Sequence, residues 1–176
     1  MLSKAIRLAT ELYDGKTRAD TGLPSIIYHM AVVSNVAVHC NDETAIVAAL
    51  LYNLIEDSHI NLDSIEDQFG QNVSKLVKEV VSINESKELS QIVKKMVESS
   101  DSAITIKLCE LFQDIYEHHK KYIHTTEESE DVLNAESVTR LNNIAELRTE
   151  LKNNKRLKRV NSIILTKMHT ELQAFL

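Results

Sequence analysis

The sequence contains few of the residues that interrupt helices. Among its 176 residues there are three glycines and a single proline, and Gly15, Gly22 and Pro24 all fall in one short stretch. Because glycine and proline are the strongest helix breakers, their scarcity predicts an all-α protein. Tryptophan is absent and aromatic residues make up only 5% of the chain, so the core is expected to consist of leucine, isoleucine, valine and alanine.

Other absences exclude whole classes of function. The formal net charge of −6 argues against a general nucleic-acid binder. Lys4 and Arg7 interrupt the first apolar residues, so no signal peptide is expected, and no apolar run approaches the length of a membrane span. Cys40 and Cys109 lie far apart and are expected to be buried free thiols. The sequence also lacks a phosphate-binding glycine loop and a nucleophile elbow. These features predict a cytoplasmic protein with no nucleic-acid partner and no membrane partner.

The spacing of apolar residues predicts a compact bundle of seven to nine helices. Residues 1–125 are expected to form one helical domain, and residues 126–176 a helical hairpin packed on it. Asn41 or Asp42, Asp63, and Asp101 or Ser102 are the expected helix-starting residues. The expected helices are Leu2–Tyr13, Ser25–Cys40, Glu43–Asp57, a short helix that Gly70 ends, Asn72–Ile83, Glu88–Glu98, Ala103–Ile123, Val132–Lys152 and Leu157–Phe175.

The apolar segment Ala45–Asp57 carries polar residues that packing does not require. Asn53 lies in its interior, and Glu56 and Asp57 lie at its end. Asparagine is costly to bury without a partner, and an acid at a helix C-terminus faces the negative end of the helix dipole at a cost of ~0.3–1 kcal/mol. A functional site is one explanation. The alternative is that Asn53 has a backbone partner and that both acids lie just beyond the helix in water.

Other candidate residues have equally ordinary alternatives. His29 lies in an apolar helix, where it is either a site residue or a hydrogen-bonded core histidine. Glu110 and Asp114 are four residues apart and share a helix face with Lys107, which is also the pattern of a solvated stripe. The basic residues between 152 and 159 suggest either an anionic partner or a solvated helix face, and the second is favoured because no aromatic residues interleave.

Five short motifs occur in order between residues 3 and 120. They are Y-D-G-K-T-R at Tyr13–Arg18, G-L-P-S-I-I-Y-H-M at Gly22–Met30, A-A-L-L-Y-N-L-I-E-D at Ala48–Asp57, F-G-Q-N-V-S-K-L-V at Phe69–Val77 and I-K-L-C-E-L-F-Q-D at Ile106–Asp114. In this order they resemble the HD-domain hydrolases of the RelA/SpoT type, which remove the 3′-pyrophosphate of the alarmone (p)ppGpp. The resemblance implies the family's all-helical fold and, for an intact member, hydrolysis with a bound divalent ion, usually manganese.

The same resemblance assigns roles to five residues. Glu56 and Asp57 match the family's catalytic acid pair. Arg18 matches the arginine that lies against the guanine base, and Lys107 matches the lysine of the family's K-L-A-D motif. Asp114 replaces an asparagine near the nucleotide, where its negative charge disfavours a phosphorylated substrate.

The metal positions depart from the family pattern. Two histidines and two aspartates hold the ion in the family. Here His29 keeps the first histidine, Tyr52 and Asn53 replace the histidine–aspartate pair, and Glu110 replaces the last aspartate. Tyrosine is protonated at neutral pH and asparagine is neutral, so two good ligands remain. Without the ion there is no strong nucleophile, because the ion's role is to lower the pKa of bound water.

Two functional hypotheses follow from this resemblance. The first is a (p)ppGpp hydrolase-like HD protein with an eroded metal site and no bound metal. It would be catalytically impaired or inactive, and it would bind a nucleotide, a protein partner or a second copy of itself. The alternative is an active metal-dependent phosphohydrolase with a rearranged site. In that case His29, Glu56, Asp57 and Glu110 would hold Mn²⁺, with Asn53 as a neutral oxygen ligand.

Overall fold

The computed structural model describes residues 1–18, 22–57, 60–86 and 88–123, together with isolated positions between 146 and 170. Within these residues it contains helices and no strand, apart from one isolated bridge between Thr17 and Pro24. The helices are α1 (Leu2–Leu12), α2 (Ser25–His39), α3 (Glu43–Asp57), α4 (Leu62–Phe69), α5 (Gln71–Asn84), α6 (Leu89–Glu98) and α7 (Asp101–Ile123). The predicted all-α class is confirmed, and the described helices reach the lower end of the predicted number.

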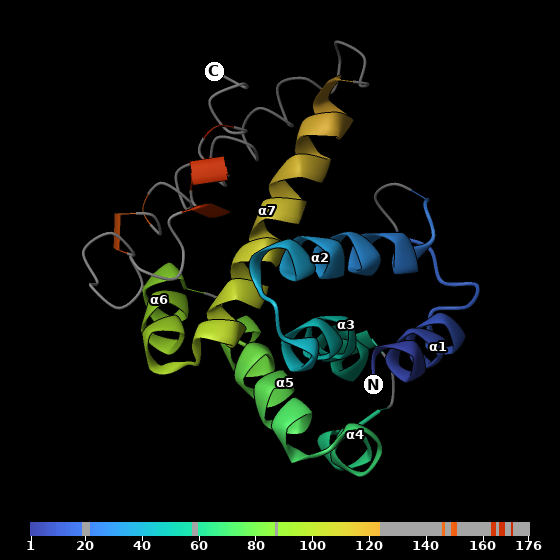
Figure 1. Ribbon diagram of the computed structural model, residues 1–176. Coiled ribbons are helices and arrows are strands. Elements are labelled where there is room, and N and C mark those ends of the chain that lie inside the picture. Colours follow the sequence, from blue (N-terminus) through green and yellow to red (C-terminus); the bar gives the residue numbers. More distant parts are fainter. Residues whose placement is uncertain are drawn as a thin grey trace.

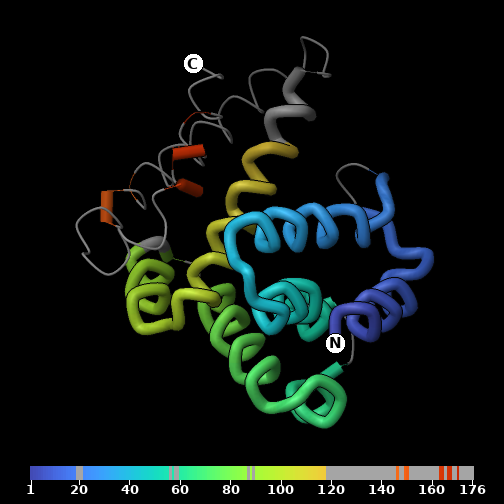
Figure 2. The backbone as a smooth tube through the Cα atoms, viewed as in Figure 1, coloured from blue at the N-terminus to red at the C-terminus, as the bar shows by residue number. Residues whose placement is uncertain are grey.

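Helix α3 occupies the centre of the bundle, where it packs against α1, α2, α5 and α7 (Figure 1). In this view α2 lies above α3, and α4 and α5 close the lower side of the bundle. The tube drawing shows residues 13–18, which follow α1, at the edge of the bundle (Figure 2). The long helix α7 packs against both α2 and α5. This arrangement brings the α1–α2 loop, α2, the end of α3 and α7 to one side of the molecule.

The apolar composition of α3 explains its central position. Every residue from 47 to 54 is buried, and Leu50, Leu51 and Leu54 have no exposed surface. A helix that is apolar on all sides is stable only when neighbours cover all of its faces. Truncating a buried leucine of this kind to alanine typically costs about 2–5 kcal/mol. The burial of α3 therefore fixes the positions of Asn53 and Asp57.

The helix starts differ from two of the predictions. Asn61, not Asp63, caps α4, because its side-chain oxygen accepts a hydrogen bond from the Ser64 backbone N–H at 2.9 Å. Helix α7 begins at Asp101 and its cap is Ser100, whose hydroxyl oxygen lies 3.3 Å from the Ala103 backbone nitrogen. In both cases the cap is a short polar residue just upstream of the predicted one, and Asn61 has the extended backbone geometry that is typical of a cap.

The predicted C-terminal hairpin lies outside the described residues. The same holds for the basic residues between 152 and 159. Among the isolated positions that are described, Ile164 is buried and belongs to the hydrophobic core. None of the helices in the described part of the chain is long and apolar enough to cross a membrane.

Candidate functional site

A cavity of about 610 Å³ opens where the α1–α2 loop meets α2, the end of α3 and α7. A volume of this size is typical of sites for small molecules. The lining contains three carboxylates, two basic residues, three aromatic or imidazole rings and two aliphatic hydroxyl groups. The lining residues are Tyr13, Lys16, Thr17, Arg18, Ser25, Tyr28, His29, Asp57, Glu110 and Asp114.

The imidazole of His29 is held from several sides. The Asn53 amide nitrogen Nδ2 lies 3.0 Å from His29 Nδ1. With the amide donating, Nδ1 accepts and the ring proton lies on Nε2. The Tyr13 ring stacks on the imidazole at a centroid distance of 4.3 Å, and Tyr28 meets it edge-on at 5.4 Å. These contacts fix the orientation of a ring that is only 6% exposed.

Burial also sets the charge of His29. It lowers the pKa of His29 to about 4; the Asp57 carboxylate opposes the shift, and the Arg18 charge adds to it. At neutral pH the imidazole is therefore uncharged.

Asp57, the last residue of α3, is tied to the α1–α2 loop. The Tyr13 hydroxyl donates a hydrogen bond to Asp57 Oδ2 at 2.9 Å. Lys16 Nζ donates to the backbone carbonyl of Asp57 at 2.7 Å, which satisfies one of the orphan carbonyls at the end of the helix. His29 Nε2 lies 3.7 Å from Asp57 Oδ2, which is within the range of an ion pair but too long for a hydrogen bond.

Lys107 and Glu110 form a pair that is largely buried within α7. Their charged groups are 2.9 Å apart, and their side chains are 11% and 14% exposed. A buried charge needs a partner of opposite sign, and each residue supplies that partner for the other. The Glu110 carboxylate, which the motif resemblance assigns to a metal position, is therefore already matched by a cation from the chain itself.

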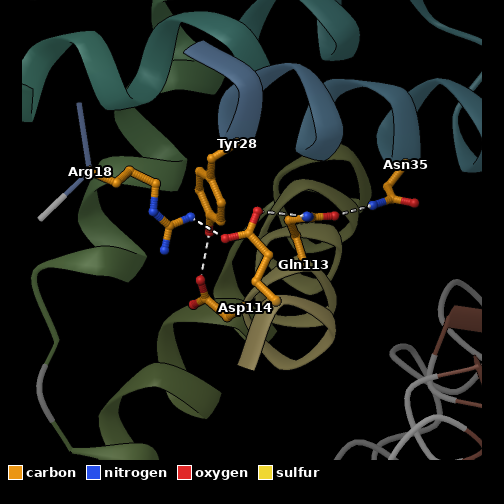
Figure 3. A network of polar contacts seen from close by, with 6 residues as sticks. Arg18, Tyr28, Asn35, Gln113 and Asp114 are labelled. Atoms are coloured by element: carbon orange, nitrogen blue, oxygen red, sulfur yellow. Dashed lines mark hydrogen bonds and ion pairs between the residues drawn. The ribbon is translucent and has the colours of Figure 1, made fainter. Parts of the chain in front are cut away.

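A second polar network joins α2, α7 and Arg18 (Figure 3). Arg18 forms an ion pair with Glu117, which also accepts a hydrogen bond from Gln113 at 3.0 Å. Gln113 in turn accepts a hydrogen bond from the side chain of Asn35 at 3.2 Å.

Tyr28 and Asp114 lie beside this network. The Tyr28 hydroxyl donates to Asp114 Oδ1 at 2.8 Å, and the Arg18 guanidinium lies 4.5 Å from the centre of the Tyr28 ring. Burial, with the Asp114 and Glu110 carboxylates, raises the pKa of Tyr28 far above its usual range. The phenol therefore stays protonated and acts as a hydrogen-bond donor.

The residues that the motif resemblance assigns to the metal positions do not fit a tight divalent site. Asn53 presents its amide nitrogen to His29, Glu110 is paired with Lys107, and Tyr52 is a fully buried phenol. Manganese prefers carboxylate, imidazole and water ligands in open geometry. In the part of the chain that the structure describes, no three or more histidine, cysteine, aspartate or glutamate side chains are arranged to hold a metal ion.

The structure brings most of the predicted site residues together. Arg18, His29, Asp57, Glu110 and Asp114 all line the cavity. Asn53 joins them through its contact with His29, and Lys107 through its pair with Glu110. Glu56 belongs to α3, but the placement of its side chain is outside the described part. The chemical roles assigned to these residues remain predictions.

The ordinary alternatives are wrong for several of these positions. The stripe on α7 is not solvated, because the Lys107 side chain is only 11% exposed and Glu110 and Asp114 line the cavity. For Asp57 the alternative is wrong in position only, because Asp57 is the last residue of α3 while its side chain is 46% exposed, as that alternative expected. The contact found for Asn53 is with the His29 side chain rather than with the backbone.

Sequence reasoning missed part of the polar network. Gln113, Asn35 and Glu117 were not singled out as site residues. The available signal was the spacing on α7, because Glu117 lies three residues after Asp114 and seven after Glu110, on the same helix face. Tyr28 precedes His29 in the second motif, but nothing in the local sequence indicates its contact with Asp114, which comes from the packing of α2 on α7.

Comparisons with known proteins agree with the fold and with the motif order. The sequence profile described as HD domain matches residues 5–108. A guanosine-3′,5′-bis(diphosphate) 3′-pyrophosphohydrolase of Aquifex aeolicus is 33% identical over 90 residues, or 51% of this chain and 13% of that protein. The bifunctional (p)ppGpp synthase/hydrolase SpoT of Escherichia coli is 33% identical over 86 residues, or 49% of this chain and 12% of that protein. The chain thus spans about an eighth of the length of these curated relatives.

One of the solved structures that match this chain covers nearly all of it. It is a metazoan ortholog of SpoT, described as hydrolysing ppGpp and playing a role in starvation responses. The two structures superpose with a TM-score of 0.65, covering 94% of this chain and 93% of that chain, at 21% sequence identity. At this identity the likeness establishes a common fold.

Proposed function

Because this chain belongs to the HD-domain family and is of the RelA/SpoT hydrolase type, we propose that it keeps the family's scaffold but does not catalyse metal-dependent hydrolysis. It works instead by binding a nucleotide-type ligand or a protein partner. The observation that carries this proposal is that the side chains at the family's metal positions bond to each other or to their neighbours. Asn53 contacts His29, and Lys107 neutralises Glu110.

The same pairing limits the chemistry of the acid pair. Glu56 and Asp57 match the catalytic acids of the family, which act on water activated by the ion. Here Asp57 is held by Tyr13 and Lys16, and among the residues that the structure describes no metal-ligand set stands beside it. In this proposal Asp57 closes the end of the cavity rather than moving protons. Arg18 and Asp114 form the wall that faces the ligand, and Lys107 acts through Glu110.

A second candidate function is supported by one observation. His29, Asp57 and Glu110 line the same cavity, so rotation of their side chains is a route to a rearranged metal site. In that case the Lys107–Glu110 pair would have to open. The protein would then be an active phosphohydrolase that uses Mn²⁺ to hydrolyse a nucleotide or alarmone.

The experiment that separates the two candidates is metal analysis combined with an assay on ppGpp. The protein is purified without chelators, its manganese and iron contents are measured, and release of pyrophosphate from ppGpp is followed with added Mn²⁺. We expect a metal content far below one ion per chain and no release above the protein-free blank. Near-stoichiometric manganese with release of pyrophosphate would contradict the proposal.

A restored variant provides the positive control. The triple variant Tyr52→His/Asn53→Asp/Glu110→Asp replaces the missing family ligands, and its fold is checked by circular dichroism because Tyr52 is fully buried. We expect this variant to bind Mn²⁺. The matched control adds His29→Ala to the same three changes and should lose that binding. A folded triple variant that binds no Mn²⁺ would show that these positions do not correspond to the family's metal ligands.

A further inference from the structure

The basic residues at the cavity already have hydrogen-bond or ion-pair acceptors within the chain. Arg18 is paired with Glu117, and Lys16 donates to the carbonyl of Asp57. The third nearby cation, Lys107, is paired with Glu110. A phosphate group binds where cations and N–H donors are available to it. The groups that would bind phosphates here are engaged with the protein's own acceptors.

The carboxylates at and beside the cavity outnumber these three cations. Asp57, Glu110 and Asp114 line it. Glu117, which pairs with Arg18, makes a fourth carboxylate. A like charge within a partly desolvated cleft repels an anion more strongly than in bulk water. The lining therefore disfavours a multiply phosphorylated ligand and suits one without charge.

Glu117 controls the charge balance of the cavity, because it neutralises Arg18. It pairs with Arg18 from across the cleft, and its other carboxylate oxygen accepts a hydrogen bond from Gln113, which Asn35 supports in turn (Figure 3). Gln113 is only 6% exposed, so the support comes from inside the bundle. The network holds the Arg18 guanidinium over the Tyr28 ring and cancels its charge.

We propose that Glu117 is a selectivity residue that makes the cavity accept an uncharged, ring-bearing molecule of nucleoside type and exclude its phosphorylated forms. Glu117 acts by positioning and neutralising Arg18, not by touching a reacting atom. The proposal rests on the proposed function, because it describes the ligand of the same non-hydrolytic cavity. Guanosine and GDP are suitable probes, since the curated relatives act on guanosine-3′,5′-bis(diphosphate).

The test is the Glu117→Gln variant, which removes the charge while keeping the size of the side chain and its ability to accept from Gln113. Binding of guanosine and of GDP is measured by calorimetry at low salt, where surface screening is weakest. We expect the wild-type protein to bind guanosine more tightly than GDP. In the variant, affinity for GDP should rise by about tenfold or more, the effect of one unit charge on a multiply charged anion at a distance of roughly 8 Å. Affinity for guanosine should stay unchanged within about twofold.

Two controls keep the result interpretable. Glu66→Gln removes the same charge from an exposed position on α4, away from the cavity lining, and should change neither affinity. Glu117→Ala removes the carboxylate by truncating the side chain and should also raise the affinity for GDP. With two charge-removing variants, the test does not depend on the folding of either one. Circular dichroism checks the fold of each variant.

Three results would overturn the proposal. They are tighter wild-type binding of GDP than of guanosine, equal changes for both probes in Glu117→Gln, and no binding of guanosine to either protein. Pyrophosphate release from ppGpp and metal content are measured in the same samples. If neither pyrophosphate release nor bound metal is found, and Glu117→Gln changes the affinities for guanosine and GDP equally, the role proposed for Glu117 is wrong and the non-hydrolytic proposal stands. If hydrolysis is found, the proposed function itself is wrong.

Discussion

Breaking the Lys107–Glu110 pair should destabilise the protein in a way that depends on which partner remains. Lys107→Met keeps the aliphatic stem but leaves the Glu110 carboxylate without its cation. Both side chains are almost buried, at 11% and 14% exposure, so solvent screens little of the lost interaction. Removing one partner of a buried pair typically costs about 3–5 kcal/mol, and we expect about 3 kcal/mol here because some exposure remains.

The double variant separates a lost pair from a lost packing contact. Lys107→Met/Glu110→Gln removes both charges, and it should recover most of the stability because no unpaired charge is left. Unfolding in urea, followed by circular dichroism, gives the free energies. In a thermal melt the single variant should unfold about 6–12 °C earlier than wild type. Lys75→Met, which changes an exposed lysine on α5, is the matched control and should have little effect.

The same cycle tests the reasoning about the metal position. Independent effects of the two substitutions, with a coupling energy near zero, would refute the claim that Lys107 supplies the cation for Glu110. A loss below about 1 kcal/mol in Lys107→Met would refute it too, since that is the size expected for an exposed pair.

Three further predictions concern the cavity and the core. In chelator-treated protein the pKa of His29 is about 4 in the folded state, against 6.5 ordinarily, so on acidification the unfolded chain binds the proton first. The neutral His29 therefore contributes its full share to the free energy of unfolding above pH 6.5. This contribution falls by about 3 kcal/mol as the pH is lowered to 4. Urea unfolding at several pH values should show that the wild-type protein loses more stability than His29→Gln in this range, and parallel profiles would contradict the assignment. Tyr13→Phe keeps the stack on His29 but removes the hydrogen bond to Asp57, so urea unfolding should show a loss of about 1 kcal/mol, whereas a larger loss of several kcal/mol would indicate that the loop packing changes as well. Burial raises the pKa of Cys109 to about 12, so a thiol reagent at pH 8 should modify Cys40 first in the native protein, and mass spectrometry of the peptides would contradict this if Cys109 reacted first.

Most of the helical fold is predictable because it depends on local signals. The scarcity of glycine and proline predicts the class, and the periodic apolar residues place the helices to within one or two residues at most ends. Helix α3 is predicted as Glu43–Asp57 and is observed over the same residues. The predicted caps of α4 and α7 were wrong because several short polar residues adjoin each helix start. The backbone conformation decides which of them acts as the cap.

The candidate site is predictable in position but not in its pairing. Motif order and spacing were enough to predict that His29, Asp57 and Glu110 lie close together, and all three line one cavity. The burial of Lys107 was not evident, since charged residues at helical spacing have the same local pattern on a solvated face and on a buried one. Only the packing of α7 against α2, α3 and α5 decides between them.

Long-range partners were equally inaccessible to sequence reasoning. Asn53 meets a histidine 24 positions away, and Arg18 meets a glutamate 99 positions away. These pairs depend on the crossing of helices rather than on any local rule. They also change the chemical interpretation, because residues that could hold a ligand are found bonded to one another.

Titration of the wild-type protein with Mn²⁺, followed by the electron paramagnetic resonance signal of the free ion, tests the central claim most directly. If side chains at the inherited metal positions are committed to partners within the chain, the free-ion signal should grow from the first addition, as it does in buffer. The restored variant with Tyr52→His, Asn53→Asp and Glu110→Asp should instead suppress the signal until one ion per chain is bound. Suppression by the wild-type protein up to one equivalent would contradict the account.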